Sequence, residues 1–212
     1  QRFIFHSAPW VWKVAYGLFY PFTYLRMMRV WKISAGWSMP YPGHPAIGIK
    51  PPRLLETALK DAGDRILSRE VDSETQIRLI ACHEVTHAFT AHLKLPAWLN
   101  EGLAMVTVDL FHGEPTVRQD SVEVLAKGEQ LGGLGRSHKI SIENKDVLVY
   151  QVGRGYWLVR YLVDTKPHLL RELLSRRYQI PELEQKVAAE CDMEREEFWK
   201  EIDGMVVAHF RT

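Results

Sequence analysis

The stretch ACHEVTHAFTAHLKLPAWLNEGLA, residues 81–104, places three histidines and two glutamates in a largely apolar passage. Burying ionisable groups is costly unless hydrogen bonds, ion pairs or a metal compensate them. His83, Glu84 and His87 form an HExxH pattern, and helical residues four apart lie on one face, about 40° apart round the axis. Both imidazoles can therefore bind one ion, at about 2.0–2.1 Å each for zinc, while Glu84 can act on a water beside it.

A catalytic zinc needs a third protein ligand, and several side chains could supply it. Glu101 is favoured because it lies on the next predicted helix, where the small residues Gly102 and Ala104 would allow close packing. His92 lies about 140° round the helix from His87 and points elsewhere. Further candidates are His112, His138 and Cys82, the last of which also fits a small buried thiol. A helix pair whose polar groups only hydrogen-bond one another, without metal, is the competing interpretation.

The motifs HEVTHAF (83–89) and PAWLNEGLA (96–104) resemble those of gluzincins, zinc metallopeptidases with two histidine ligands and one glutamate ligand. The short interval between them is most similar to the compact peptidase MA-like proteins, or minigluzincins. A fainter resemblance covers YQVGRGYWLVRYL (150–162). The resemblance implies an α+β, predominantly helical, zincin-like fold in one domain, residues 1–212. Its N-terminal part (1–95) would hold a small sheet and the HExxH helix, and its C-terminal part (96–212) would be helical.

In function, the resemblance implies hydrolysis of a peptide or protein substrate with one zinc ion per chain. His83, His87 and Glu101 would hold the ion, and Glu84 would be the general base for a metal-activated water. Tyr150 and Tyr156 are the candidate donors to the developing oxyanion. The alternative is a catalytically degenerate scaffold that binds zinc, although a purely structural site has no use for Glu84.

Thermolysin-like relatives carry an acidic residue four positions after the glutamate ligand, where it orients a metal-bound histidine. Here that position is Met105, and Asp109, two turns beyond Glu101, is the candidate replacement. Loss of such a partner can cost 10- to 100-fold in metal affinity or activity. Arg154 fits either a substrate carboxylate site or a solvated surface position.

The chain begins with mixed secondary structure and ends helical. Loops are predicted at 34–45, which is dense in Gly and Pro, and at 111–146, with a short helix at 121–128. The segment AIGIK (46–50) reads as an edge strand, which in peptidases of this type holds the substrate backbone by strand addition. The other predicted elements are a strand at 2–7 and helices at 9–29, 54–67, 73–93 (capped by Asp72 or Ser73), from Pro96, from Val147, and at 167–177, 181–192 and 193–210.

Charge is unevenly distributed along the chain. Residues 1–60 hold eight Lys or Arg and one acidic residue, Glu56, a net charge of +7; since the whole chain carries +1, the remainder carries −6. This basic, aromatic segment fits either an anionic membrane surface or an aromatic core helix with solvated cations. The nearly neutral total gives no reason to expect nucleic acid as a partner.

The N-terminal segment holds no predicted membrane span, because its longest uncharged run, residues 14–25, is too short and contains Pro21. The first residue is Gln1 and not Met, which allows for an upstream signal or anchor that has been removed. Two distant cysteines, Cys82 and Cys191, exclude a disulfide framework and favour a reducing compartment.

Overall fold

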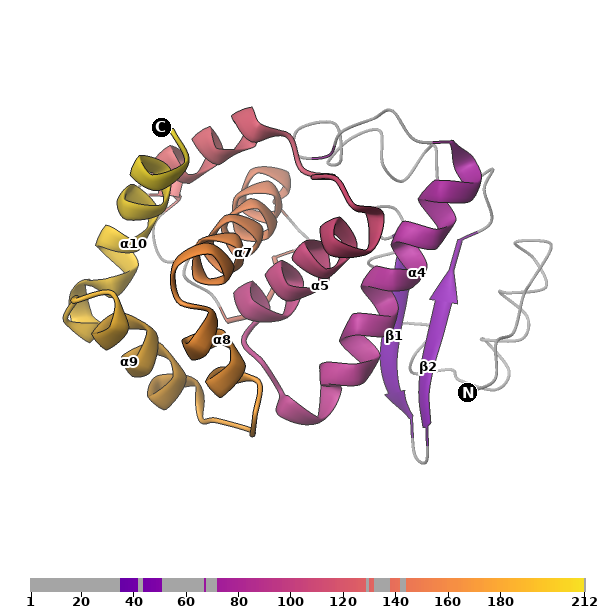
Figure 1. Cartoon of the computed structure of the whole chain (residues 1–212), viewed down its shortest axis with the longest axis horizontal. Coiled ribbons are helices and arrows are strands. Elements are labelled where there is room, and N and C mark those ends of the chain that lie inside the picture. The colour runs from indigo at the N-terminus through magenta and orange to yellow at the C-terminus, as the bar shows by residue number, and fades with distance from the viewer. Residues whose placement is uncertain are drawn as a thin grey trace.

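The computed structural model describes residues 35–41, 44–50, 67, 72–128, 130–131, 138–141 and 144–211. Over these residues the protein is predominantly helical with one two-stranded sheet, which confirms the predicted secondary-structure class (Figure 1). The strand predicted at 2–7, the helix predicted at 9–29 and nearly all of the helix predicted at 54–67 lie outside the described residues. The last residue of that helix, Leu67, instead forms an antiparallel bridge with Val117.

The sheet consists of β1 (Gly36–Tyr41) and β2 (His44–Ile49), which pair antiparallel from Gly36 opposite Ile49 to Tyr41 opposite His44. Strand β2 confirms the strand predicted at 46–50 and begins two residues earlier. The loop predicted at 34–45 is wrong, because β1 occupies most of it. The glycines and prolines of residues 34–45 are local signals for a loop. The pairing of β1 with β2 and the packing of both strands on α4 (Ser73–Thr90) outweigh these signals.

Helix α4 is followed by a 3₁₀ turn, η2 (Ala91–Leu93), and then by α5 (Ala97–His112). Asp72 is the N-cap of α4, since its carboxylate accepts hydrogen bonds from the amides of Glu74 and Thr75 at 2.9 and 3.0 Å. Helix α5 begins at Ala97, with Pro96 as an extended N-cap and not as the first helical residue. The short connection places α5 against α4, as the sequence predicts.

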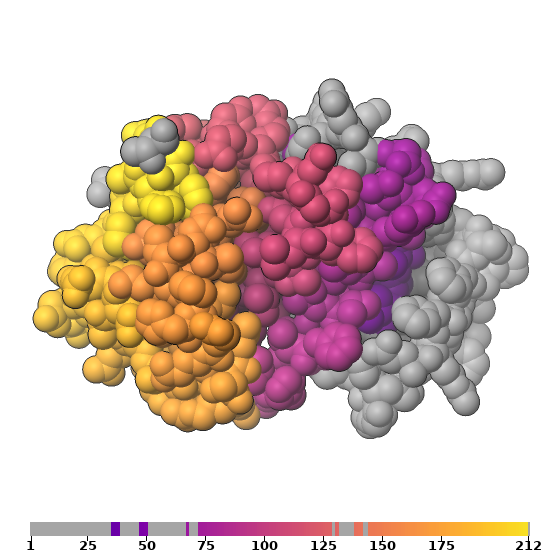
Figure 2. Space-filling model, in the orientation of Figure 1, coloured from indigo at the N-terminus to yellow at the C-terminus, as the bar shows by residue number. Residues whose placement is uncertain are grey.

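The C-terminal part consists of helices packed around α7 (Lys145–Thr165), which contacts α5 and most of the later helices (Figure 1). These are η3 (Gln119–Lys127), which confirms the short helix predicted at 121–128, α8 (Pro167–Leu173), α9 (Ile180–Glu190) and α10 (Arg195–Phe210). Fully buried apolar residues join them into one core, among them Leu99, Val159, Leu162, Phe198 and Ile202. In the space-filling view this part lies directly against α4 and α5 (Figure 2).

Gly102 faces α7 and not α4. A Cβ atom at Gly102 would lie 2.0 Å from the carbonyl oxygen of Gly155, so α5 and α7 cross too closely for any side chain at position 102. The expectation that Gly102 lets α5 approach the HExxH helix is therefore wrong, because successive helical residues point about 100° apart and Glu101 takes the direction of α4. No helix in the described part of the chain combines the length and apolar character needed to cross a bilayer.

Candidate metal centre

His83 and His87 from α4 and Glu101 from α5 converge on one point. The two Nε2 atoms are 3.0 Å apart, and the rings meet edge to face with centroids 4.6 Å apart. The Glu101 oxygens lie 3.5 Å from Nε2 of His83 and 3.6 Å from Nε2 of His87. One ligand atom from each of the three residues can be chosen so that all three atoms lie within 4.8 Å of one another. The three residues singled out by the sequence are thus brought together, and we call them the His–His–Glu cluster.

These distances fit a tetrahedral metal ion. Two ligands at 2.0–2.1 Å from one tetrahedral ion lie about 3.3–3.4 Å apart. The separations of 3.0, 3.5 and 3.6 Å lie near that value, and the last two run to different oxygens of Glu101, Oε2 for His83 and Oε1 for His87. Two neutral nitrogens and one carboxylate oxygen are also the ligand types that zinc accepts. The cluster can therefore hold a metal ion, and three protein ligands leave a coordination position for water or substrate.

Glu101 and His87 shift the pKa of one another. Burial alone would raise the pKa of Glu101, but hydrogen bonds from His83 and His87 outweigh it and hold this pKa well below its usual range. Burial likewise lowers the pKa of His87, but Glu101, with a smaller effect from Asn100, raises it overall. Without a cation in the cluster, the Glu101 carboxylate therefore favours the protonated form of His87, and a metal ion bound at His87 would displace that proton.

Glu84 follows His83 on α4 and is the one fully buried residue of that helix, with 6% of its surface exposed. Burial raises its pKa to about 7, while the charges of His83 and His87 act in the opposite direction. A carboxylate with a pKa near neutrality can both accept and return a proton at physiological pH. The arrangement thus combines three residues that could hold a metal ion with an adjacent proton acceptor.

Among the described residues, no acidic side chain other than Glu101 contacts the two histidines in the way that the resemblance would require. Asp109 does not replace it, because its carboxylate accepts hydrogen bonds from the amide and hydroxyl of Thr116 at 2.8 and 2.7 Å and from Tyr156 at 2.7 Å. Within the described part of the chain, Nδ1 of His87 is buried and makes no hydrogen bond. The neighbouring group is Asn100, whose side-chain oxygen lies 3.5 Å from Thr90 Oγ1. Sequence reasoning missed Asn100, although its position directly before Glu101 places it near the site.

The two tyrosines predicted as oxyanion donors are engaged elsewhere. The Tyr156 hydroxyl donates to Asp109, which lies eight residues, about 12 Å of helix, beyond Glu101. Burial and the Asp109 charge raise the Tyr156 pKa above its usual range. The Tyr150 hydroxyl donates to Asp203 of α10. The structure therefore does not bring either hydroxyl to the His–His–Glu cluster.

Arg154 is neither solvated nor open to a substrate carboxylate. It is 2% exposed, its Nε donates to Asp203 at 2.7 Å, and its guanidinium lies 4.0 Å from the Trp199 ring. Buried cations of this kind hold helices together through their partners. Its role in this structure is to join α7 to α10.

No family model matches this chain. Comparison with curated proteins and with solved structures likewise finds no match. The functional interpretation therefore depends on the His–His–Glu cluster and its surroundings.

The remaining candidate ligands do not join the cluster. Nδ1 of His92 lies 2.9 Å from the Phe89 carbonyl, His138 pairs with Glu184 at 3.4 Å, and Cys82 approaches the Thr107 carbonyl.

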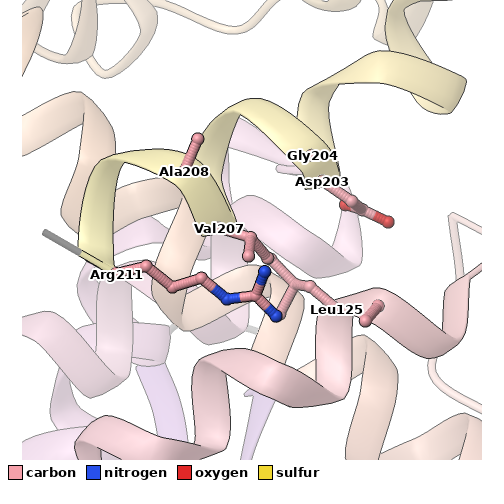
Figure 3. A pocket seen from close by; sticks show the side chains of 7 residues that line it. Leu125, Asp203, Gly204, Val207, Ala208 and Arg211 are labelled. Atoms are coloured by element: carbon pink, nitrogen blue, oxygen red, sulfur yellow. The ribbon is translucent and has the colours of Figure 1, made fainter.

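A pocket between η3 and α10 is separate from the His–His–Glu cluster (Figure 3). That pocket is lined by Leu125, Ala126, Asp203, Gly204, Val207, Ala208 and Arg211.

Proposed function

We propose that the protein is a zinc-dependent peptidase of gluzincin type with a zincin-like fold. The observation that carries the proposal is the convergence of His83, His87 and Glu101 within 4.8 Å, with Glu84 buried beside them on the same helix. A structural zinc site is usually closed by four protein ligands, whereas three ligands and a nearby carboxylate are the catalytic pattern. The local resemblance of residues 83–89 and 96–104 to gluzincins supports the same proposal.

In this proposal the three cluster residues hold one zinc ion. When bound, zinc supplies a Lewis acid that polarises a peptide carbonyl and makes a water molecule more acidic. Glu84 accepts the proton from the attacking water and returns it to the leaving amine. Burial raises the pKa of Glu84 to about 7 in the metal-free protein, and the charge of a bound dication would favour the ionised form that accepts the proton.

The test is cleavage of a mixed peptide library by the zinc-loaded protein, with Glu84→Gln as the paired variant. We expect cleavage by the wild type and loss of at least 100-fold in Glu84→Gln, with one zinc still bound per chain. Glu74→Gln, on the exposed first turn of the same helix, is the matched control and should cleave normally. Zinc bound by wild type and variant, with no cleavage by either, would refute the peptidase proposal.

A zinc-binding scaffold without activity is the second candidate. It is favoured by the buried, unbonded Nδ1 of His87 and by the engagement of Asp109 with Thr116 and Tyr156. A histidine without a partner for its second nitrogen is less well oriented as a metal ligand. The same library experiment separates the two candidates. The membrane-surface hypothesis concerns residues 1–60, most of which lie outside the described residues, and flotation with anionic liposomes tests it.

A further inference from the structure

Strand β1 lies directly on the side chain of Glu84. A Cβ atom built on Gly36 would stand 2.8 Å from Glu84 Oε1, 2.9 Å from Glu84 Cγ and 2.9 Å from Ile80 Cγ2. Real Cβ atoms do not approach other heavy atoms so closely, so a side chain at position 36 would displace the glutamate, the isoleucine or the strand. Gly36 is itself buried. The main chain of β1 therefore forms the wall against which the Glu84 carboxylate is packed.

Packing on the opposite face of the hairpin joins β1 to β2. Successive strand residues point to opposite faces, so Trp37 points away from the side on which Gly36 meets α4. The Trp37 ring covers Gly48 of β2, where a Cβ atom would lie 1.9 Å from it, and Trp37 is 7% exposed. Moving β1 alone away from α4, to admit a larger residue at position 36, would disturb its packing on β2, which also contacts α4. The space beside Glu84 is therefore limited by the hairpin as a whole.

Solvent reaches the ligands more readily than the base. Glu84 is 6% exposed, whereas the side chains of His83 and Glu101 are each 24% exposed. Strand β1 runs in the same direction as α4 and behind it in Figure 1, on the side of α4 away from α5. The site is thus closed over the carboxylate and open over the ligands.

We propose that Gly36 is a positioning residue for Glu84: its missing side chain lets β1 cover the carboxylate and hold it in one place beside the His–His–Glu cluster. The proposal rests on the proposed function, in which Glu84 is the general base. It adds that the first strand of the hairpin, which contributes no residue to the His–His–Glu cluster, determines whether the base is correctly placed. An error of about 1 Å in such a position can cost about 100-fold in rate.

The first experiment is a double-mutant cycle on thermal stability, measured on the metal-free protein with Gly36→Ala, Glu84→Ala and the double variant. Gly36→Ala should lower the melting temperature by about 4–8 °C, as overpacking does in a chain of this size. In the Glu84→Ala background at least half of this loss should disappear, because two of the three crowded atoms have been removed. Gly204→Ala, with no atom within 4 Å of its Cβ position, is the control and should not lower the melting temperature.

The second experiment compares kcat and KM of Gly36→Ala and wild type on a peptide cleaved by the wild type. We expect kcat to fall about 10- to 100-fold with KM changed less than about threefold and zinc content unchanged. A glycine needed only for folding would lower the folded fraction and leave kcat per bound zinc unchanged. If Gly36→Ala does not fold, recovery of folding in the double variant supports the proposal, and failure of both overturns it.

The outcomes separate this proposal from the proposed function. Equal losses from Gly36→Ala with and without the Glu84 side chain, or a kcat within twofold of wild type, overturn the role of Gly36 while leaving the peptidase intact. A further outcome is that the effects of Gly36→Ala and Glu84→Ala on stability depend on each other while the wild type cleaves no peptide. That result would overturn the proposed function and show that the contact between Gly36 and Glu84 serves packing alone.

Discussion

Replacing Glu84 with glutamine should stabilise the metal-free protein at alkaline pH and leave it almost unchanged at acidic pH. Burial raises the folded pKa of Glu84 from 4.5 to about 7. Between these two values the folded state binds more protons than the unfolded state, so stability falls as pH rises. The stabilising contribution of the protonated form is complete below pH 4.5 and is lost as pH rises through 7. The loss amounts to about 3 kcal/mol of unfolding free energy.

Glutamine has nearly the same shape as glutamate but carries no charge at any pH, so the variant should lack this loss. The difference in unfolding free energy between Glu84→Gln and wild type should grow from near zero at about pH 4 to about 3 kcal/mol at about pH 8.5. The assay is urea denaturation of chelator-treated protein, followed by far-ultraviolet circular dichroism at several pH values. The exposed Glu74→Gln variant should follow the wild type. Parallel profiles for Glu84→Gln and wild type would show that Glu84 is not desolvated in the folded protein.

The remaining predictions concern packing, a buried ion pair and the ligand set. Gly102→Ala would place its methyl carbon 2.0 Å from a main-chain oxygen of α7, and we expect a loss of about 3 kcal/mol in thermal or urea unfolding; an unchanged melting temperature would contradict the helix crossing. Asp203→Asn removes the carboxylate that pairs with buried Arg154 and should cost about 3 kcal/mol, whereas the exposed Glu197→Gln should cost less than about 0.5 kcal/mol. His83→Ala should abolish zinc retention after dialysis, measured by elemental analysis, while His92→Ala should keep one zinc per chain, because His92 lies outside the cluster.

The cluster was predictable because its residues lie close together in the sequence, on two consecutive α-helices. The i, i+4 spacing of His83 and His87 places both rings on one face of any helix, and the short connection after η2 leaves α5 few directions other than back along α4. The Asp72 cap was predictable for the same reason, since an N-cap side chain bonds only to the amides that follow it. Long helical segments of the C-terminal part also carry their own signals, and the structure confirms α7, α8, α9 and α10 to within a few residues at each end.

Features that depend on partners distant in the sequence could not be read in this way. Strand β1 contains a glycine and a proline and reads as loop, yet β2 and α4 make it a strand. Asp109 stands two turns from Glu101, but Thr116 and Tyr156, on other elements, decide where its carboxylate points. The same holds for Arg154, whose burial depends on Asp203 and Trp199 about fifty residues later. In each case the sequence shows the residue type, but the surroundings that determine its role come from other elements.

In the proposed function, a metal ion would account for more of the site than internal hydrogen bonding does. Two imidazole nitrogens 3.0 Å apart, with a carboxylate on their other side, can share a proton without any metal. That arrangement accounts for three residues but not for Glu84, a fourth ionisable group that α4 buries beside them although its ionised form is disfavoured. A dication at the centre of the cluster replaces the shared proton, satisfies both nitrogens and Glu101, and favours ionisation of Glu84 by its charge. A single bound metal ion would thus offset the free-energy cost of burying four ionisable groups. Metal binding should therefore add directly to the folding free energy.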